Sequence, residues 1–118
     1  MGVLGINHIA FRTPDVTRLH GFYRELLAAE ELSGEHEPLR AGSTLLVFFE
    51  GRAGGEDELA FDVDRSGFDE ALERAQAMRL NVRGPVDHTP WSKGFYTSDP
   101  DGRHIEIVYD DKGVYWQE

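Results

Sequence analysis

The sequence contains no cysteine. This absence excludes disulfide bonds, thiolate metal sites and cysteine nucleophiles, and it suits a reducing compartment. Long apolar runs are also missing, since no stretch approaches the roughly 18 apolar residues that a membrane helix needs. The N-terminus lacks the basic-then-apolar pattern of a secretory signal. We therefore expect a soluble cytoplasmic protein that does not associate with a membrane.

Basic residues are scarce. The sequence has 12 Lys and Arg against 22 Asp and Glu, which gives a formal net charge of -10. A protein of this charge repels nucleic acid, and no basic stripe interrupts the acidic background. The charge favours a cationic ligand or a divalent metal, although an acidic surface also serves solubility alone. Phosphate-binding loops, nucleophile elbows and zinc-finger spacings are absent as well.

The sequence is an internal duplication of one short pattern. "NHIAF" at 7–11 returns about 50 residues later as "DELAF" at 57–61, and "GSTLLVFFE" at 42–50 returns as "GRHIEIVYD" at 102–110. Two copies indicate a duplication, because a solenoid needs three or more. We therefore predict a single domain of two repeats, 1–52 and 55–118, joined by a glycine-rich hinge.

Each repeat reads as a strand, a helix and then two or three strands. Apolar residues at helical spacing predict a first helix that begins near Asp15 as its N-cap, and a second that begins near Ser66. Alternating apolar and polar residues predict the strands. The tetrapeptide Asp99-Pro100-Asp101-Gly102 predicts a reverse turn between the last two strands.

Several motifs in this order resemble those of the vicinal oxygen chelate superfamily. They are "NHIAF" with "FYRELL", "LAFDVD", and above all "FYTSDPDGRHIEIV" near the C-terminus. The superfamily includes glyoxalase I, fosfomycin-resistance enzymes, extradiol dioxygenases and bleomycin-binding proteins. The resemblance implies an α+β fold of two βαβββ modules in tandem. Each module would be a cupped mixed or antiparallel sheet with its helix on the convex face, and facing cups would enclose a site.

Strand alternation assigns side chains to the two faces of each sheet. The apolar set that a helix should cover is Ile9, Phe11, Leu59, Phe61 and Val63. His8, Glu58 and Glu106 then lie on the concave face. A slip of one residue in any strand would reverse this assignment.

The resemblance implies that His8, Glu58 and Glu106 bind a divalent metal ion. The fourth family position falls on Leu46, which cannot bind a cation. One imidazole and two carboxylates suit Mn, Ni, Zn, Fe or Co. The set departs from the two histidines and one glutamate of the fosfomycin enzymes and dioxygenases. The alternative is that all three are ordinary strand residues, hydrogen-bonded or facing solvent.

Other residues are candidates for catalysis or substrate binding. Glu106 and His104 are the candidate catalytic residues, and His104 could be a fourth ligand, a proton shuttle or an ordinary strand residue. The candidates for substrate binding are Arg12, Asp62, Trp91 and Tyr96. Arg12 and Asp62 should line the concave side, where an ion pair is their alternative role. The aromatic pair could form a wall, and core packing would explain Tyr96 equally well. We expect the remaining histidines, His20, His36 and His88, at the surface.

These observations favour a small metal-dependent enzyme of the glyoxalase and dioxygenase class. Resemblance implies that it chelates vicinal oxygens of a small substrate and stabilises an enolate or oxyanion, in a lyase, isomerase or transferase reaction. The alternative is a non-catalytic protein that sequesters a ligand, like the bleomycin-binding proteins. We expect a small-molecule partner and a homodimer with sites between chains, although a closed monomer is equally compatible with the sequence.

Overall fold

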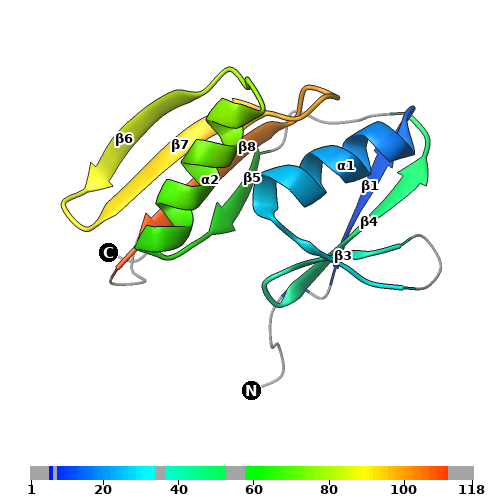
Figure 1. Ribbon diagram of the computed structural model, residues 1–118, viewed down its shortest axis with the longest axis horizontal. Helices are drawn as coiled ribbons and strands as arrows, with labels where there is room; N and C mark the ends of the chain where they lie inside the picture. Colours follow the sequence, from blue (N-terminus) through cyan, green and yellow to red (C-terminus); the bar gives the residue numbers. More distant parts are fainter. Residues whose placement is uncertain (1–5, 7, 34–36, 53–57, 112–118) are drawn as a thin grey trace. The chain divides into compact units, whose positions relative to one another are not determined.

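The computed structural model describes residues 6, 8–33, 37–52 and 58–111 (Figure 1). The chain divides into two compact units, Met1–Gly54 and Gly55–Glu118, which we call module one and module two. Most of the predicted hinge lies outside the described residues. No helix of the described part is long and apolar enough to span a membrane.

Both modules have the order βαβββ. Module one contains β1 (His8–Thr13), α1 (Val16–Leu27), β2 (Glu30–Glu31), β3 (Leu39–Ala41) and β4 (Thr44–Glu50). Module two contains β5 (Glu58–Asp62), α2 (Arg65–Ala77), β6 (Arg83–Thr89), β7 (Ser92–Ser98) and β8 (His104–Asp110). The strand orders are β1-β4-β3-β2 and β5-β8-β7-β6. In each sheet the first two of these strands are parallel and the other pairs are antiparallel. The predicted α+β fold of two βαβββ modules is confirmed.

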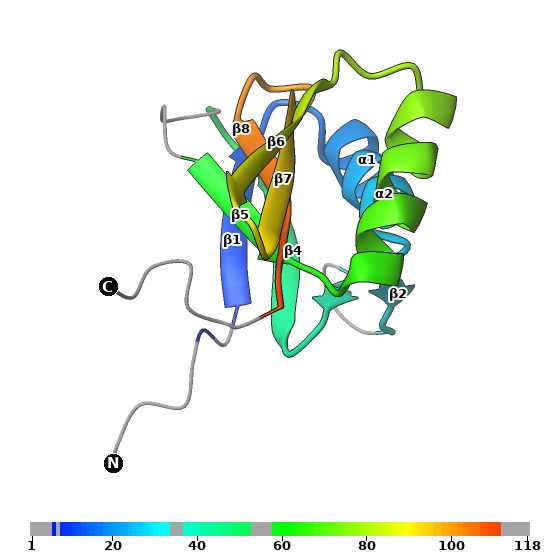
Figure 2. The ribbon, with the colours of Figure 1, turned by 90° about the vertical axis from the view of Figure 1, so that its left-hand side faces the viewer.

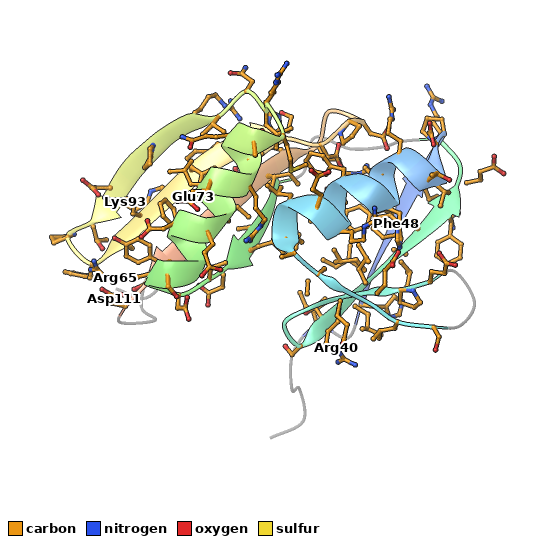
Figure 3. All side chains as sticks on the ribbon, viewed as in Figure 1. Arg40, Phe48, Arg65, Glu73, Lys93 and Asp111 are labelled. Carbon is orange, nitrogen blue, oxygen red and sulfur yellow. The ribbon has the colours of Figure 1, made fainter. Side chains whose placement is uncertain are left out.

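The core of module one lies between α1 and its sheet. Phe11 of β1 stacks on Phe48 of β4 with ring centroids 5.3 Å apart, and Tyr23 of α1 lies 4.9 Å from Phe11. Leu19 and Leu26 of α1 are fully buried in the same layer. Figure 3 shows Phe48 between α1 and the sheet. We call this side of a sheet its helix face.

Module two repeats this arrangement with its own aromatic layer. Phe68 of α2 makes edge contacts with Phe95 and Tyr109, at centroid distances of 5.5 and 5.3 Å. Ile105 and Ile107 are fully buried beside them. Figure 2 shows α2 running along one side of the module-two sheet. Because side chains alternate along β8, the residues between these apolar ones lie on the opposite face.

The two helices begin with the same kind of cap. Asp15 is the N-cap of α1, as predicted, and accepts a hydrogen bond from the amide of Arg18 at 3.0 Å. The predicted N-cap of α2, Ser66, is wrong, because the cap is Asp64. Asp64 Oδ1 accepts from the amide of Gly67 at 2.7 Å, and the Ser66 hydroxyl donates to the same oxygen at 3.1 Å. The carboxylate satisfies an amide of the first helical turn that would otherwise lack a partner.

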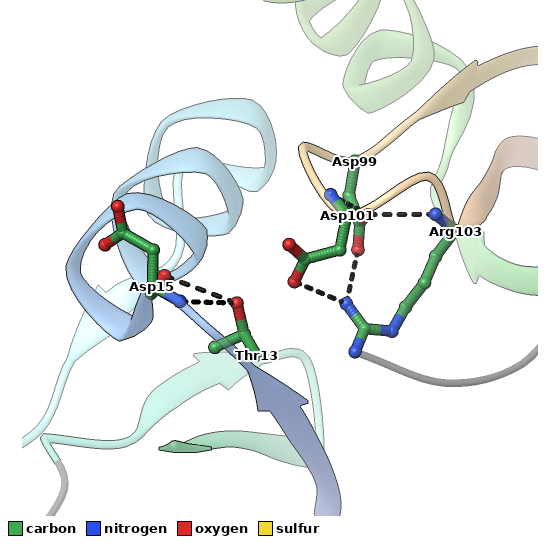
Figure 4. A network of polar contacts seen from close by, with 5 residues as sticks. All are labelled: Thr13, Asp15, Asp99, Asp101 and Arg103. Carbon is green, nitrogen blue, oxygen red and sulfur yellow. Dashed lines mark hydrogen bonds and ion pairs between the residues drawn. The ribbon is translucent and has the colours of Figure 1, made fainter. Parts of the chain in front are cut away.

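The predicted reverse turn before β8 is confirmed and is closed by a buried ion pair (Figure 4). The amide of Gly102 donates to the carbonyl of Asp99 at 2.9 Å. Asp99 Oδ1 accepts from the amides of Asp101 and Arg103, both at 2.9 Å. Arg103 Nη1 lies 3.1 Å from Asp99 Oδ2 and 3.2 Å from Asp101 Oδ2. In the loop of module one shown in Figure 4, the Thr13 hydroxyl contacts the backbone amide and carbonyl of Asp15.

Candidate functional site

Three strands of module two bring a polar cluster together on the face opposite α2. His88 of β6 lies with its Nε2 2.7 Å from Glu106 Oε2 of β8. The hydroxyl of Tyr96, on β7, lies 3.3 Å from the same ring nitrogen. The side chain of Glu106 is 2% exposed and that of His88 is 13% exposed. We call His88, Tyr96 and Glu106 the β6–β8 cluster.

A glycine on the intervening strand makes this contact possible. Strand β7 lies between β6 and β8, so the imidazole must cross β7 to reach Glu106. A Cβ at Gly94 would lie 2.8 Å from His88 Nε2 and closer still to Glu106 Oε2. The β6–β7 register also shifts between Asp87 and Thr89, on either side of His88. Such an irregularity redirects a side chain, and glycine in a strand interior marks a close approach.

The cluster has the chemistry of a proton-transfer or cation-binding site. A carboxylate removed from water needs a hydrogen-bond or charge partner, and His88 is that partner for Glu106. His88 Nε2 donates to Glu106 when it carries a proton and accepts from the Tyr96 hydroxyl when it does not. The guanidinium of Arg83 lies 6.0 Å from the centre of the Tyr96 ring, at the edge of the cluster.

Of the predicted metal ligands, Glu58 and Glu106 share one face of module two. Strand β5 pairs with β8 so that Glu58 lies beside His104 and Ala60 lies beside Glu106. Glu58 is therefore one strand across and two residues along from Glu106, on the same face, and it is exposed. His8 is exposed on β1 of module one, on the face opposite α1.

The predicted fourth position on Leu46 is wrong by one residue. Leu46 is fully buried on the helix face and pairs with Ile9. The residue that corresponds to Glu106 is Val47, because Val47 pairs with Ala10 as Glu106 pairs with Ala60. The two modules differ in the connection before this strand: Gly42 and Ser43 alone join β3 to β4, whereas 99–103 join β7 to β8. Valine, like leucine, offers a metal no ligand.

A family model described as the glyoxalase/bleomycin resistance protein/dioxygenase superfamily matches residues 5–107. The chain belongs to this superfamily.

Several solved structures share the fold of this glyoxalase-superfamily chain over nearly the whole of both chains. Lactoylglutathione lyase from Agrobacterium tumefaciens is 21% identical, with all of both chains covered and a TM-score of 0.75. The fosfomycin resistance protein FosX from Mesorhizobium loti is 21% identical, with 91% of this chain and 92% of that chain covered and a TM-score of 0.73. The oxidase ChaP-H2 is 22% identical, with coverages of 96% and 98% and a TM-score of 0.78. No curated protein sequence matches the chain.

The remaining predicted site residues of this superfamily member are divided between the modules. In module two, His104 and Asp62 are exposed on the same face as Glu106. Trp91 is half-buried in the β6–β7 turn, where its amide donates to Thr89 Oγ1 at 3.2 Å. In module one, Arg12 is exposed, with its guanidinium 5.9 Å from the ring centre of Phe49.

Two histidines predicted at the surface are largely buried, so that expectation is wrong for them. The side chain of His20 is 11% exposed and that of His88 is 13% exposed. His36 lies outside the described residues. The signal for His88 was Gly94, since a glycine two residues before Tyr96 in a strand indicates that another side chain approaches there. The bulge that aims His88 inward has no comparable sequence signal.

Proposed function

We propose that this protein is a small metal-dependent enzyme that acts on a small substrate with two neighbouring oxygen atoms. Superfamily membership supports the class of chemistry. The observation that carries the proposal is the buried carboxylate of Glu106, which contacts His88 over the space left by Gly94. A strand-borne carboxylate with 2% exposure is costly unless it has a task or a partner, and here it has a titratable partner.

The donor types on this face suit a divalent ion. Glu106 of β8 supplies one carboxylate. Glu58 adds a second carboxylate from the adjacent strand. Imidazole with carboxylates suits Mn, Ni, Zn, Fe or Co.

We propose that Glu106 and Glu58, together with His8 of module one, hold this ion. When bound, it supplies a Lewis acid that polarises the substrate oxygens. His88 would hold or move a proton at Nε2, because this atom lies within hydrogen-bond distance of both the Glu106 carboxylate and the Tyr96 hydroxyl. Arg12, Asp62, His104 and Trp91 remain proposed substrate-contact or proton-transfer residues. The proposed assembly is a homodimer.

A ligand-sequestering protein is the second candidate. It is favoured by the net charge of -10 and by two carboxylates on one face of module two, which would attract a cationic ligand without any reaction. This candidate requires no tight metal site. Metal binding that depends on Glu106 and Glu58 therefore separates the two candidates.

Metal titration of the full chain tests the proposal. Chelator-treated protein is titrated with Mn²⁺, Ni²⁺ and Zn²⁺, and unfolding is followed with each ion. An ion at 100 times its Kd should raise the free energy of unfolding by about 2.7 kcal/mol. Glu106→Gln and Glu58→Gln should each weaken binding at least about tenfold, because changing even a residue that only hydrogen-bonds a metal ligand has an effect of this size.

Glu73→Gln is the matched control, since Glu73 is an exposed glutamate of α2 in the same module (Figure 3). Its titration should follow that of the unmodified chain. If Glu106→Gln and Glu58→Gln both bind every ion as the unmodified chain does, the metal site is wrong and the ligand-sequestering candidate takes its place.

A further inference from the structure

Module one carries its own group of potential metal ligands, on three elements that the proposed enzyme site does not use. His20 belongs to α1, Glu31 ends β2, and Glu37 lies two residues before β3. Each offers a ligand atom, and the three atoms lie within 4.8 Å of one another. His20 Nε2 is 3.0 Å from the backbone carbonyl oxygen of Glu37 and 3.6 Å from Glu31 Oε1.

We propose that His20, Glu31 and Glu37 form a divalent-cation site in module one. The donors are one imidazole nitrogen and two carboxylates. This mixture favours a first-row divalent ion such as Zn²⁺, Ni²⁺ or Co²⁺ over Mg²⁺, which prefers oxygen ligands alone. All three residues belong to module one, so the inference does not depend on the function proposed above.

Strand β2 and the residues just before β3 bring the ligands together. Strand β3 has three residues and its pairing with β4 ends at Leu39 and Leu46. The chain before β3 therefore no longer pairs with β4, and Glu37, with a φ of 38°, turns its carbonyl oxygen toward His20. The His20 ring is also held by an edge contact with Phe48, at 5.5 Å between ring centres. The result is a helix side chain fixed against a loop.

A cavity beside this group leaves room for an ion and its water ligands. Its volume is about 650 Å³. It is lined by His20 and Glu37 together with Pro14, Asp15, Val16, Thr17, Phe48, Phe49 and Glu50. Water molecules in the cavity could complete the coordination sphere, since three protein ligands leave positions open. The lining also includes two further carboxylates, Asp15 and Glu50, which make the surroundings more favourable for a cation.

The guanidinium of Arg24 already contacts this group and could compete with a metal ion for Glu31. Arg24 Nη1 lies 3.2 Å from Glu31 Oε1. An ionised carboxylate has two oxygens and about four lone-pair sites, so Glu31 can bind Arg24 and an ion together. Two carboxylates against one guanidinium leave a negative balance before Asp15 and Glu50 are counted. The site therefore retains its preference for a cation.

Module two has no counterpart of this group among the residues that the structure describes. His20 follows the buried Leu19 on α1, and the residue that follows the buried Phe68 on α2 is the exposed Asp69. The competing explanation for His20 is purely structural, namely a hydrogen bond from its ring to the Glu37 carbonyl. The test must separate this bond from metal binding.

Calorimetric titration of the full chain with Zn²⁺ and Ni²⁺, in the Glu106→Gln background, isolates module one. We expect one equivalent of ion to bind in this background. His20→Gln and Glu31→Gln, each added to it, should weaken that binding at least tenfold. Binding of Zn²⁺ should also shift the NMR signals of the His20 ring, a change that a structural hydrogen bond does not predict.

Two controls keep the result interpretable. Glu31 is 45% exposed on its side chain, so Glu31→Gln should fold normally, which circular dichroism in chelator verifies. Glu73→Gln should leave the titration unchanged. Unaltered ion binding in both His20→Gln and Glu31→Gln would overturn the inference, as would the absence of any binding in Glu106→Gln alone. If Glu106→Gln instead binds as the unmodified chain does and His20→Gln does not, this site stands and the proposed enzyme site fails.

Discussion

The two modules share a topology but differ in what their sheets carry on the face opposite the helix. At corresponding positions, module one has Val47 and module two has Glu106. Strand β3 of module one has three residues, whereas β7 of module two has seven, which pair along their whole length with β8. The polar contact between β6 and β8 depends on that full-length β7, because Gly94 is part of it.

This difference shows how two copies of one pattern can take different tasks. A complete sheet encloses a carboxylate and an imidazole in module two. In module one the short β3 leaves a cavity beside α1, and potential ligands gather there instead. Strand pairing is therefore the same in both modules, whereas the length of the third strand, β3 or β7, determines where polar side chains can be buried.

The largest expected effect comes from the loop that only module two has. Arg103→Ala should lower the free energy of unfolding by about 3 kcal/mol, because it leaves the buried Asp99 carboxylate without its charge partner. The value lies at the low end for a buried pair, since two backbone amides still donate to Asp99. Urea denaturation at neutral pH measures the change.

The matched control is an exposed ion pair of module one. Arg40, labelled in Figure 3, lies with its Nε 3.3 Å from Glu30 Oε1. Both side chains are at least half exposed. Arg40→Ala should cost less than about 1 kcal/mol. If the two arginine variants lose the same stability, the contrast between a buried loop network and a surface pair is wrong.

The next effect concerns Gly94 of β7, which leaves room for the contact between His88 and Glu106. Gly94→Ala should cost about 1–3 kcal/mol, because the added methyl displaces His88 and Glu106 from each other. Metal binding that depends on Glu106 should weaken in the Gly94→Ala variant as well. Gly21→Ala is the control, since its Cβ would meet nothing closer than Arg24 Nη2 at 3.9 Å. On α1 this change should stabilise by up to about 1 kcal/mol. If the two variants show the same change in unfolding free energy and in metal affinity, a methyl group at Gly94 does not clash with His88 and Glu106.

Much of the fold follows from local patterns that the sequence displays directly. Alternation placed Phe11 under the helix, and it placed Glu58 and Glu106 together on the other face. The Asp99–Gly102 turn and the cap at Asp15 were predicted from residue type alone. These features depend on neighbours along the chain, and short-range preferences are what a single sequence carries best.

The parts that could not be predicted depend on contacts across strands. The error at Leu46 arose because motif similarity does not fix the strand pairing: the motifs align Leu46 with Glu106, whereas the pairing places Val47 at that position. His88 was misplaced because a bulge and a distant glycine determine its direction. His20 was misplaced because its partners, Glu31 and Glu37, come from a segment without a regular pattern. The shared face of Glu58 and Glu106 was therefore predicted, whereas the contact of His88 with Glu106 was not.

The smallest effect is a pH dependence of the stability that the N-cap of α2 contributes. The amide of Gly67 and then the Ser66 hydroxyl, both donating to Asp64, hold the pKa of its carboxyl below its usual value. Since the folded pKa is depressed, the stability that this cap contributes is fully present above the unfolded pKa, about 3.9, and is lost as pH falls through the folded pKa. Asp64→Asn keeps a capping side chain but cannot ionise. Its unfolding free energy, measured by urea between pH 2 and 6, should therefore fall less steeply below pH 4 than that of the unmodified chain.

Ser66→Ala is an intermediate variant for comparison with Asp64→Asn. It removes the second of the two donors and keeps the first, so the acid-side slope should lie between those of the unmodified chain and Asp64→Asn. The effect should be small because Asp64 is exposed to solvent, which screens its interactions. An unchanged slope in Asp64→Asn would mean that this carboxylate caps α2 equally well with or without its charge. The cap would then act through hydrogen-bond geometry alone, because an asparagine oxygen accepts from the Gly67 amide as a carboxylate does.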